Sequence, residues 1–197
     1  MTRFEYEQDA WVQNLRVLGI DEAGRGPLAG PLVVAGVILK PGTNHELIKD
    51  SKALSSKQRQ LAFQEVLRQS LAYEVEIVSP QAIDDSNIYA ITLVTMQKIA
   101  DKLETNLILA DAMALAQPQA IKLIKGDQRS ISIAAASILA KVVRDHLMLG
   151  YDMRYPQYGF KKHKGYPTKA HYEALAIHGP CPIHRRSFKL TQTSSLF

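Results

Sequence analysis

Short apolar runs alternate with longer amphipathic stretches along most of this chain. Apolar and β-branched runs of strand length predict five strands, over residues 15–21, 31–39, 73–78, 106–110 and 120–124. Apolar residues that recur at helical spacing predict helices over residues 55–70, 87–103, 131–149 and 168–178. Strands that come early and then alternate with helices favour one α/β domain with a mixed sheet.

Length and composition narrow the class of protein. The chain has 197 residues, of which 46% are apolar and 22% charged, values typical of one globular domain and not of a disordered or fibrous chain. Its longest uncharged stretch, residues 26–39, is too short to span a membrane, and the acidic N-terminal segment does not resemble a secretory signal. The single cysteine, Cys181, excludes an intrachain disulfide, which agrees with a cytoplasmic location.

The net charge of +5 is unevenly distributed. From Met153 onward there are eight Lys and Arg residues and one acid, Glu173, so this part carries +7 and residues 1–152 carry −2. Five of the eight tyrosines lie between Tyr151 and Tyr172. A basic, aromatic-rich segment is typical of a surface that binds a polyanion such as a nucleic acid, but a solvated basic surface has the same composition.

The densest chemical signal follows the first predicted strand. Asp21 and Glu22 stand at its end and run directly into a Gly- and Pro-rich loop, a setting that suits a hard cation such as Mg²⁺. For these neighbours to share one site, the strand must end or bulge there, because adjacent side chains of a strand face opposite ways. Residues 24–29 formally match a dinucleotide-binding fingerprint, but Pro27, Pro31 and a strand follow where that motif needs a helix.

Two further acids follow apolar strand-like runs. Asp111 comes after residues 107–110, and Asp127 comes after Ile124 and two loop residues. Acids at several strand ends can meet at one rim of a sheet, where divalent cations would neutralise their mutual repulsion. These edges together predict a metal site, whereas one cysteine and scattered histidines do not fit a structural zinc.

Small polar and basic groups near these acids are candidate substrate contacts. Ser137, Lys141 and Arg144 occupy one face of the helix predicted after Asp127, because they follow at spacings of four and three residues. These three side chains could bind a phosphate backbone, or they could simply face solvent. Asn87 and the segment 50–52, which includes Lys52, lie at the edges of predicted elements and on their own indicate little.

Several segments together resemble the ordered signatures of ribonuclease HII. The resemblance covers residues 15–188 in the order of that family, and the combination is far more specific than any one piece. The matching segments are residues 19–27 (GIDEAGRGP), 50–52 (DSK), 83–88 (IDDSNI), 125–127 (KGD), 134–145 (AAASILAKVVRD), 165–168 (GYPT) and 184–188 (HRRSF).

The resemblance implies a ribonuclease H-like fold in residues 1–188, with a helical basic part from about residue 153 and a tail at 189–197. It implies a metal-dependent endonuclease that cuts the RNA-containing strand of RNA–DNA hybrids and the 5′ side of a single ribonucleotide in duplex DNA. Two Mg²⁺ or Mn²⁺ ions, about 4 Å apart, would promote in-line hydrolysis, leaving a 5′-phosphate and a 3′-hydroxyl.

Family roles transfer to matching positions only. The catalytic and metal-binding acids fall on Asp21, Glu22, Asp111 and Asp127. The ribose-recognising loop falls on Gly24, Arg25 and Gly26, and the tyrosine that senses the RNA–DNA junction falls on Tyr166. The remaining expected substrate contacts, chiefly to phosphates, are Lys52, Asn87, Ser137, Lys141 and Arg144.

The chain departs from the family pattern at one position. Ala112 follows the third acid, where the family usually has glycine. If that position requires a positive φ, alanine is strained there.

Two other classes of function remain open. A different nuclease or transposase of the same fold would also use three or four acids, but it has no evident use for Gly-Arg-Gly together with Tyr-Pro-Thr. A non-catalytic module that binds hybrids would keep the basic part but has no use for acids at strand ends.

The last residues suggest a protein partner. Gln192 followed by a terminal Leu196-Phe197 resembles the short peptides with which bacterial DNA-processing enzymes bind the replication sliding clamp. The alternative is that Leu196 and Phe197 fold back onto the domain. We otherwise expect a monomer that binds RNA–DNA hybrids and ribonucleotide-containing DNA and no membrane.

Overall fold

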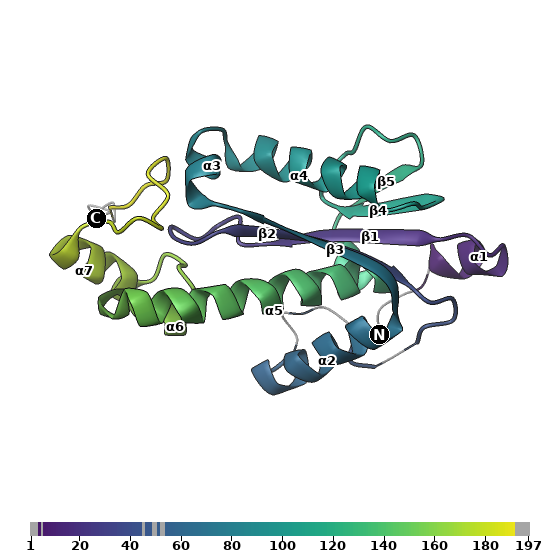
Figure 1. Ribbon diagram of the computed structural model, residues 1–197, viewed down its shortest axis with the longest axis horizontal. Coiled ribbons are helices and arrows are strands. Elements are labelled where there is room, and N and C mark those ends of the chain that lie inside the picture. The colour runs from purple at the N-terminus through teal and green to yellow at the C-terminus, as the bar shows by residue number, and fades with distance from the viewer. Residues whose placement is uncertain (1–3, 5, 45, 49–50, 52–53, 192–197) are drawn as a thin grey trace, which may run out of the picture.

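A five-stranded mixed sheet forms the centre of the protein (Figure 1). The structure, a computed structural model, describes residues 4, 6–44, 46–48, 51 and 54–191. The strand order is β3-β2-β1-β4-β5; β2 is antiparallel to both of its neighbours, whereas β1, β4 and β5 are parallel. The strands are β1 (Val17–Ala23), β2 (Leu32–Leu39), β3 (Ser70–Val78), β4 (Leu107–Asp111) and β5 (Ala120–Leu123).

Helices cover both faces of this sheet (Figure 1). The long α5 (Ile131–Arg154) and α2 (Ser56–Gln69) lie on one face, and α3 (Pro80–Asp84) and α4 (Ile88–Lys102) lie on the other. The remaining helical segments are α1 (Glu7–Val12), η2 (Gly126–Gln128), η3 (Pro156–Tyr158), α6 (Phe160–His163) and α7 (Lys169–His178). The predicted α/β architecture is confirmed.

Strand β2 is buried on both faces, which explains its unbroken apolar sequence. Every residue of β2 is buried; Val33 and Val37 pack toward α5 and α2, and Val34 packs toward α4. At Gly19 the backbone of α5 comes so close that a Cβ would lie 2.1 Å from the carbonyl carbon of Ser132. The helix that carries Ser137 is therefore pressed directly against β1.

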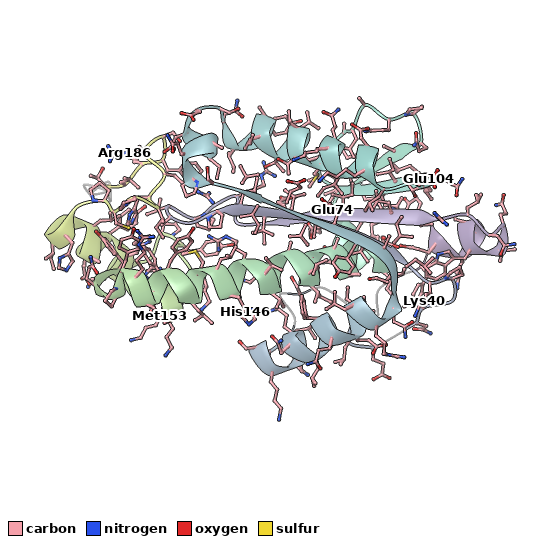
Figure 2. The ribbon with its side chains drawn as sticks, viewed as in Figure 1. Lys40, Glu74, Glu104, His146, Met153 and Arg186 are labelled. Carbon is pink, nitrogen blue, oxygen red and sulfur yellow. The ribbon has the colours of Figure 1, made fainter. Side chains whose placement is uncertain are left out.

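The basic C-terminal part gathers at one end of the molecule, around the end of α5. Figure 2 shows Arg186 at this end and Met153 projecting from α5 away from the sheet. The composition change near Tyr151 is not a structural boundary, because α5 runs without a break to Arg154. Tyr158, Phe160 of α6 and Leu175 of α7 belong to a separate small hydrophobic core at this end.

The five predicted strands and four predicted helices are all present. The sequence pattern did not reveal α1, α3 and α6, which have six, five and four residues and are too short to show helical periodicity. In the described part of the chain, no helix is both long and apolar enough to cross a membrane.

Candidate active site

Asp21 lies on the face of β1 that packs against α5. Its side chain is 6% exposed. Oδ1 accepts a 2.7 Å hydrogen bond from the backbone amide of Glu22, and the side chain of Ser137 on α5 lies near enough to the carboxylate to lower its pKa. The Ser137 hydroxyl lies 3.0 Å from that of Ser51. The amide of Glu22 thus orients Asp21, and the Ser51–Ser137 pair lies beside it.

Asp111 emerges next to Asp21. Strands β1 and β4 are parallel, and Ile20 pairs with Ala110, the residue before Asp111. The two aspartates therefore leave neighbouring strands at the same edge and, by alternation, on the same face of the sheet.

The fourth acid lies in the loop that leads into α5. The backbone amide of Gly126 donates a 2.7 Å hydrogen bond to Oδ1 of Asp111. Asp127 follows at once in η2 and is 4% exposed. The left-handed backbone of Lys125, with φ +53°, turns the chain sharply at this point. The hydrogen bond from Gly126 thus links the loop that contains Asp127 to the side chain of Asp111.

Burial and like charge raise the pKa of Asp21 well above its ordinary value. Loss of water is the larger cause, and the charges of Glu22 and Asp111 add to it. A nearby cation would offset both effects. Carboxylate oxygens are also the ligands that Mg²⁺ and Mn²⁺ prefer. The chemical type of these side chains therefore fits a divalent cation.

Glu22 leaves the opposite face of β1 from Asp21. For Asp21 and Glu22 to share one site, β1 would have to end or bulge at Asp21. Instead β1 stays regular beside β2, with Glu22 paired to Val34. Glu22 Oε1 lies 3.6 Å from Arg25 Nη1. Among the residues described, no three Asp, Glu, His or Cys side chains form a group that could hold a metal ion, which agrees with this alternation. That all four acids converge therefore stays a prediction.

The loop after β1 requires glycine at Gly24. Its φ is +100°, and a Cβ there would lie 2.1 Å from Nε of Arg144. Gly26, by contrast, is exposed, and the heavy atom nearest to the point that a Cβ would occupy there is Tyr166 Cε1, at 3.9 Å. The expected ribose loop and the expected junction tyrosine are therefore neighbours in space.

Arg144 does not have the role that its sequence position suggested. Its side chain is fully buried, and its three nitrogens donate to the carbonyls of Pro31 (2.9 Å), Lys164 (3.0 Å) and Ala29 (3.1 Å). Its guanidinium also lies 5.7 Å from the centre of the Tyr166 ring. The expected phosphate contact is thus corrected: Arg144 holds the loop after Gly24 and the base of Tyr166.

Three histidines support the backbone of Tyr166. The amide of Cys181 donates to Nδ1 of His184, so the Nε2–H of His184 faces Nε2 of His171 at 3.0 Å. Nδ1–H of His171 then donates to the Tyr166 carbonyl at 2.9 Å. The Tyr166 amide donates to the carbonyl of His163, also at 2.9 Å. Tyr166 itself is 41% exposed.

The remaining expected contacts have mixed outcomes. Ser137 is buried, its hydroxyl pairs with that of Ser51, and it lies near the Asp21 carboxylate; a substrate contact by Ser137 stays a prediction. Asn87 caps α4, its Oδ1 accepting from Ala90 at 2.8 Å. Lys141 is paired with Asp145 at 2.7 Å. Substrate contacts by Asn87 and Lys141 stay predictions, and Lys52 and the tail 192–197 lie outside the described residues.

Ala112 adopts the left-handed backbone conformation that glycine adopts most easily. Its φ is +55°, in the left-handed region that a Cβ disfavours. The chain therefore carries local strain directly after Asp111.

Sequence reasoning missed Arg185, which is fully buried and donates to the backbone of the Gly24 loop. The segment 184–188 contributed to the family resemblance, but no spacing rule indicates that an arginine in a basic segment is buried.

The family model for ribonuclease HII matches residues 18–191. This chain belongs to the ribonuclease HII family. A ribonuclease HII of Levilactobacillus brevis is 47% identical over 194 residues, covering 96% of this chain and 75% of that protein. A ribonuclease HII of Syntrophotalea carbinolica is 48% identical over 179 residues, covering 88% of this chain and 85% of that protein.

Solved structures agree with this family and its ribonuclease H-like fold. The crystal structure of ribonuclease H2 from Pyrococcus horikoshii matches with a TM-score of 0.77 and 27% identity, covering 89% of this chain and 95% of that one. The structure of a complex of PCNA with ribonuclease HII from Archaeoglobus fulgidus matches with a TM-score of 0.77 and 28% identity, covering 92% and 98%. As a member of the ribonuclease HII family, the chain is an endonuclease of the ribonuclease H type, a hydrolase that acts on RNA–DNA.

Proposed function

We propose that this enzyme cuts the RNA-containing strand of RNA–DNA hybrids and also cuts on the 5′ side of single ribonucleotides in duplex DNA. The observation that carries the proposal is the packing of Tyr166 against Gly26, in the loop that directly follows Asp21 and Glu22. A glycine-rich loop beside a half-exposed ring, next to buried acids, suits recognition of one ribose followed by cleavage at it.

The acids Asp21, Asp111 and Asp127 would hold divalent cations, and Glu22 would add its carboxylate from the opposite face of β1. When bound, two Mg²⁺ or Mn²⁺ ions supply an activated water and charge stabilisation for the leaving 3′-oxygen. Asp21, oriented by the amide of Glu22 and close to Ser137, offers its carboxylate for this purpose. The expected products carry a 5′-phosphate and a 3′-hydroxyl. A structure of a distant ribonuclease HIII of the same fold is described as a complex with Mn²⁺, which is compatible with this proposal.

Substrate would be held by contacts on either side of the acids. The backbone of Gly24–Gly26 would approach the ribose, where a 2′-hydroxyl distinguishes RNA from DNA. The Tyr166 ring would stack on the neighbouring deoxyribose, where an extra hydroxyl would be crowded. The basic residues from 153 onward would attract the phosphate backbone.

Cleavage of a labelled RNA–DNA hybrid tests the proposed chemistry. We expect cutting with Mg²⁺ or Mn²⁺ and none with a chelator, and we expect ends that a DNA polymerase can extend, because extension requires a 3′-hydroxyl. Products that cannot be extended, or cutting that persists in the chelator, would contradict it. Binding of the hybrid without any cutting would favour a non-catalytic module.

We also infer a protein partner, the replication sliding clamp, for the tail 192–197. The inference rests on the sequence of this tail and on the related archaeal ribonuclease HII, whose structure was solved as a complex with PCNA. Deleting residues 192–197 should abolish clamp binding and leave cleavage of a short duplex unchanged. Unchanged clamp binding would exclude this role for the tail.

A further inference from the structure

Arg185 is a buried cation that the proposed chemistry does not use. Its side chain is fully buried, and its guanidinium donates four hydrogen bonds to three backbone carbonyls of one loop. Nη2 bonds to Gly24 O at 2.6 Å and to Gly30 O at 2.9 Å, Nη1 bonds to Arg25 O at 3.0 Å, and Nε bonds to Gly30 O at 3.0 Å. One side chain thus joins the two ends of the loop that contains Gly24, Arg25 and Gly26.

The position of Arg185 is itself firmly anchored. Its amide donates to the carbonyl of Leu28 at 2.8 Å. The next two amides, of Arg186 and Ser187, both donate to the carboxylate of Asp84, at 2.8 and 3.0 Å. Burial, and then the charge of Arg144, lower the pKa of Arg185 to about 9. The hydrogen bonds to the loop carbonyls offset the cost of burying this charge.

These contacts determine where the loop amides point. In a planar trans peptide, the C=O of one residue and the N–H of the next point in opposite directions. Because Arg185 holds the carbonyls of Gly24 and Arg25, the amides of Arg25 and Gly26 point away from it. Within the described chain neither amide donates a hydrogen bond to another group, and Gly26 is exposed. Two adjacent donors are therefore presented on the side of the loop opposite Arg185.

We propose that Arg185 is a positioning residue for sugar discrimination, because it orients the amides of Arg25 and Gly26 toward the 2′-oxygen of a ribonucleotide. This proposal rests on the proposed function. Arg144 provides the contrast: it is equally buried and donates to the carbonyls of Ala29, Pro31 and Lys164, none of which belongs to the peptides of the two amides.

Duplex binding by an Arg185→Lys variant tests the proposal. A lysine ammonium keeps the charge but cannot hold three carbonyls in the planar pattern of a guanidinium. Both proteins carry Asp21→Asn to prevent cutting, and Kd is measured for a duplex with one ribonucleotide and for its all-DNA counterpart. We expect Arg185→Lys to lower the preference for the ribonucleotide by roughly tenfold, as for two lost hydrogen bonds, with DNA binding unchanged.

The control is Ile99→Ala, in the same Asp21→Asn background. Ile99 is fully buried on α4 and packs on Gly36, so its loss destabilises the protein without touching the loop. We expect this variant to melt earlier and yet keep the full preference. A preference in Arg185→Lys equal to that of the parent would overturn the role of Arg185. Absence of any preference in the parent would instead count against the proposed function itself.

If Arg185→Lys does not fold, hydrogen exchange of the parent protein tests the proposal instead. Hydrogen exchange of the Arg25 and Gly26 amides is followed with each duplex. We expect the ribonucleotide duplex to slow exchange at both amides at least severalfold more than the all-DNA duplex does. Equal exchange with the two duplexes would overturn the proposal, because the amides that Arg185 orients would then not contact the 2′-oxygen.

Discussion

Tyr166 lies beside Gly26, with its ring atom Cε1 3.9 Å from the point that a Cβ on Gly26 would occupy. Gly26 belongs to the loop after β1, and Tyr166 lies beyond α6, so residues far apart in the sequence meet here. The meeting depends on Gly165, whose backbone carbonyl accepts a 2.8 Å hydrogen bond from Leu28. A backbone hydrogen bond therefore joins the segment of the proposed junction sensor to that of the proposed ribose loop.

Tyr166→Ala should impair cutting at a single embedded ribonucleotide more than cutting of a continuous RNA–DNA hybrid. A stacked aromatic ring contributes about 1–3 kcal/mol, so the rate at the single ribonucleotide should fall about tenfold or more relative to the hybrid. Tyr166→Phe keeps the ring and should retain most of the preference. Equal losses of rate on both substrates would show that Tyr166 has only a structural role.

Asp21→Asn should abolish cleavage while leaving the fold and duplex binding largely intact. The change removes a charge from the proposed cation site with almost no change in volume. Asp101→Asn is a suitable control, because Asp101 is an exposed acid on α4 that bonds to Gln117; its cleavage rate should equal that of the parent. Turnover by Asp21→Asn near the parental rate would show that Asp21 does not hold the cation.

Ala112→Gly should stabilise the protein. The φ of Ala112 is +55°, and relief of a left-handed alanine contributes about 1 kcal/mol, which raises Tm by about 2–4 °C in a chain of this size. Ala114→Gly, in the same loop but without a positive φ, should instead lower Tm slightly, because glycine gains entropy in the unfolded chain. If both variants melted below the parent, residue 112 would not be strained.

Acid should destabilise the fold through His184. Burial, and then the charge of His171, lower the pKa of His184 from 6.5 to about 4, so the unfolded chain binds a proton more readily than the folded one between these values. Stability due to neutral His184 is therefore present above pH 6.5 and is lost as pH falls toward 4, by up to about 2 kcal/mol between pH 7 and pH 5.

Urea unfolding at pH 7 and pH 5 measures this loss. His184→Gln removes the titrating group, and its free energy of unfolding should change less over the same interval even if the variant is less stable at pH 7. The same slope in both proteins would mean that other groups cause the acid sensitivity.

Much of the fold follows from local sequence. The unbroken apolar run of β2 and the helical spacing over α4 and α5 identify these elements, and Ser55 and Asn87 stand as caps where α2 and α4 begin. The acids were recognisable because Asp21 and Asp111 directly follow apolar strand residues, and parallel pairing brings such ends together.

Tertiary packing decides the rest. Arg144 looked like a phosphate ligand because it shares a helix face with Lys141, but that face turns inward near the end of β1, so the arginine meets carbonyls instead. Arg185 was overlooked for a related reason: only a contact between positions 161 residues apart reveals that it holds Gly24. Alternation along β1 separates Glu22 from Asp21, and it does so because pairing with β2 continues regularly to Ala23.

The most direct test of this account is a cleavage assay on two matched duplexes in Mg²⁺, identical except that one contains a single ribonucleotide. We predict one cut, on the 5′ side of the ribonucleotide, in the first duplex and no cut in the all-DNA duplex. Cutting of both duplexes alike, or of neither while a continuous hybrid is cut, would contradict the claim that this site recognises a single ribose.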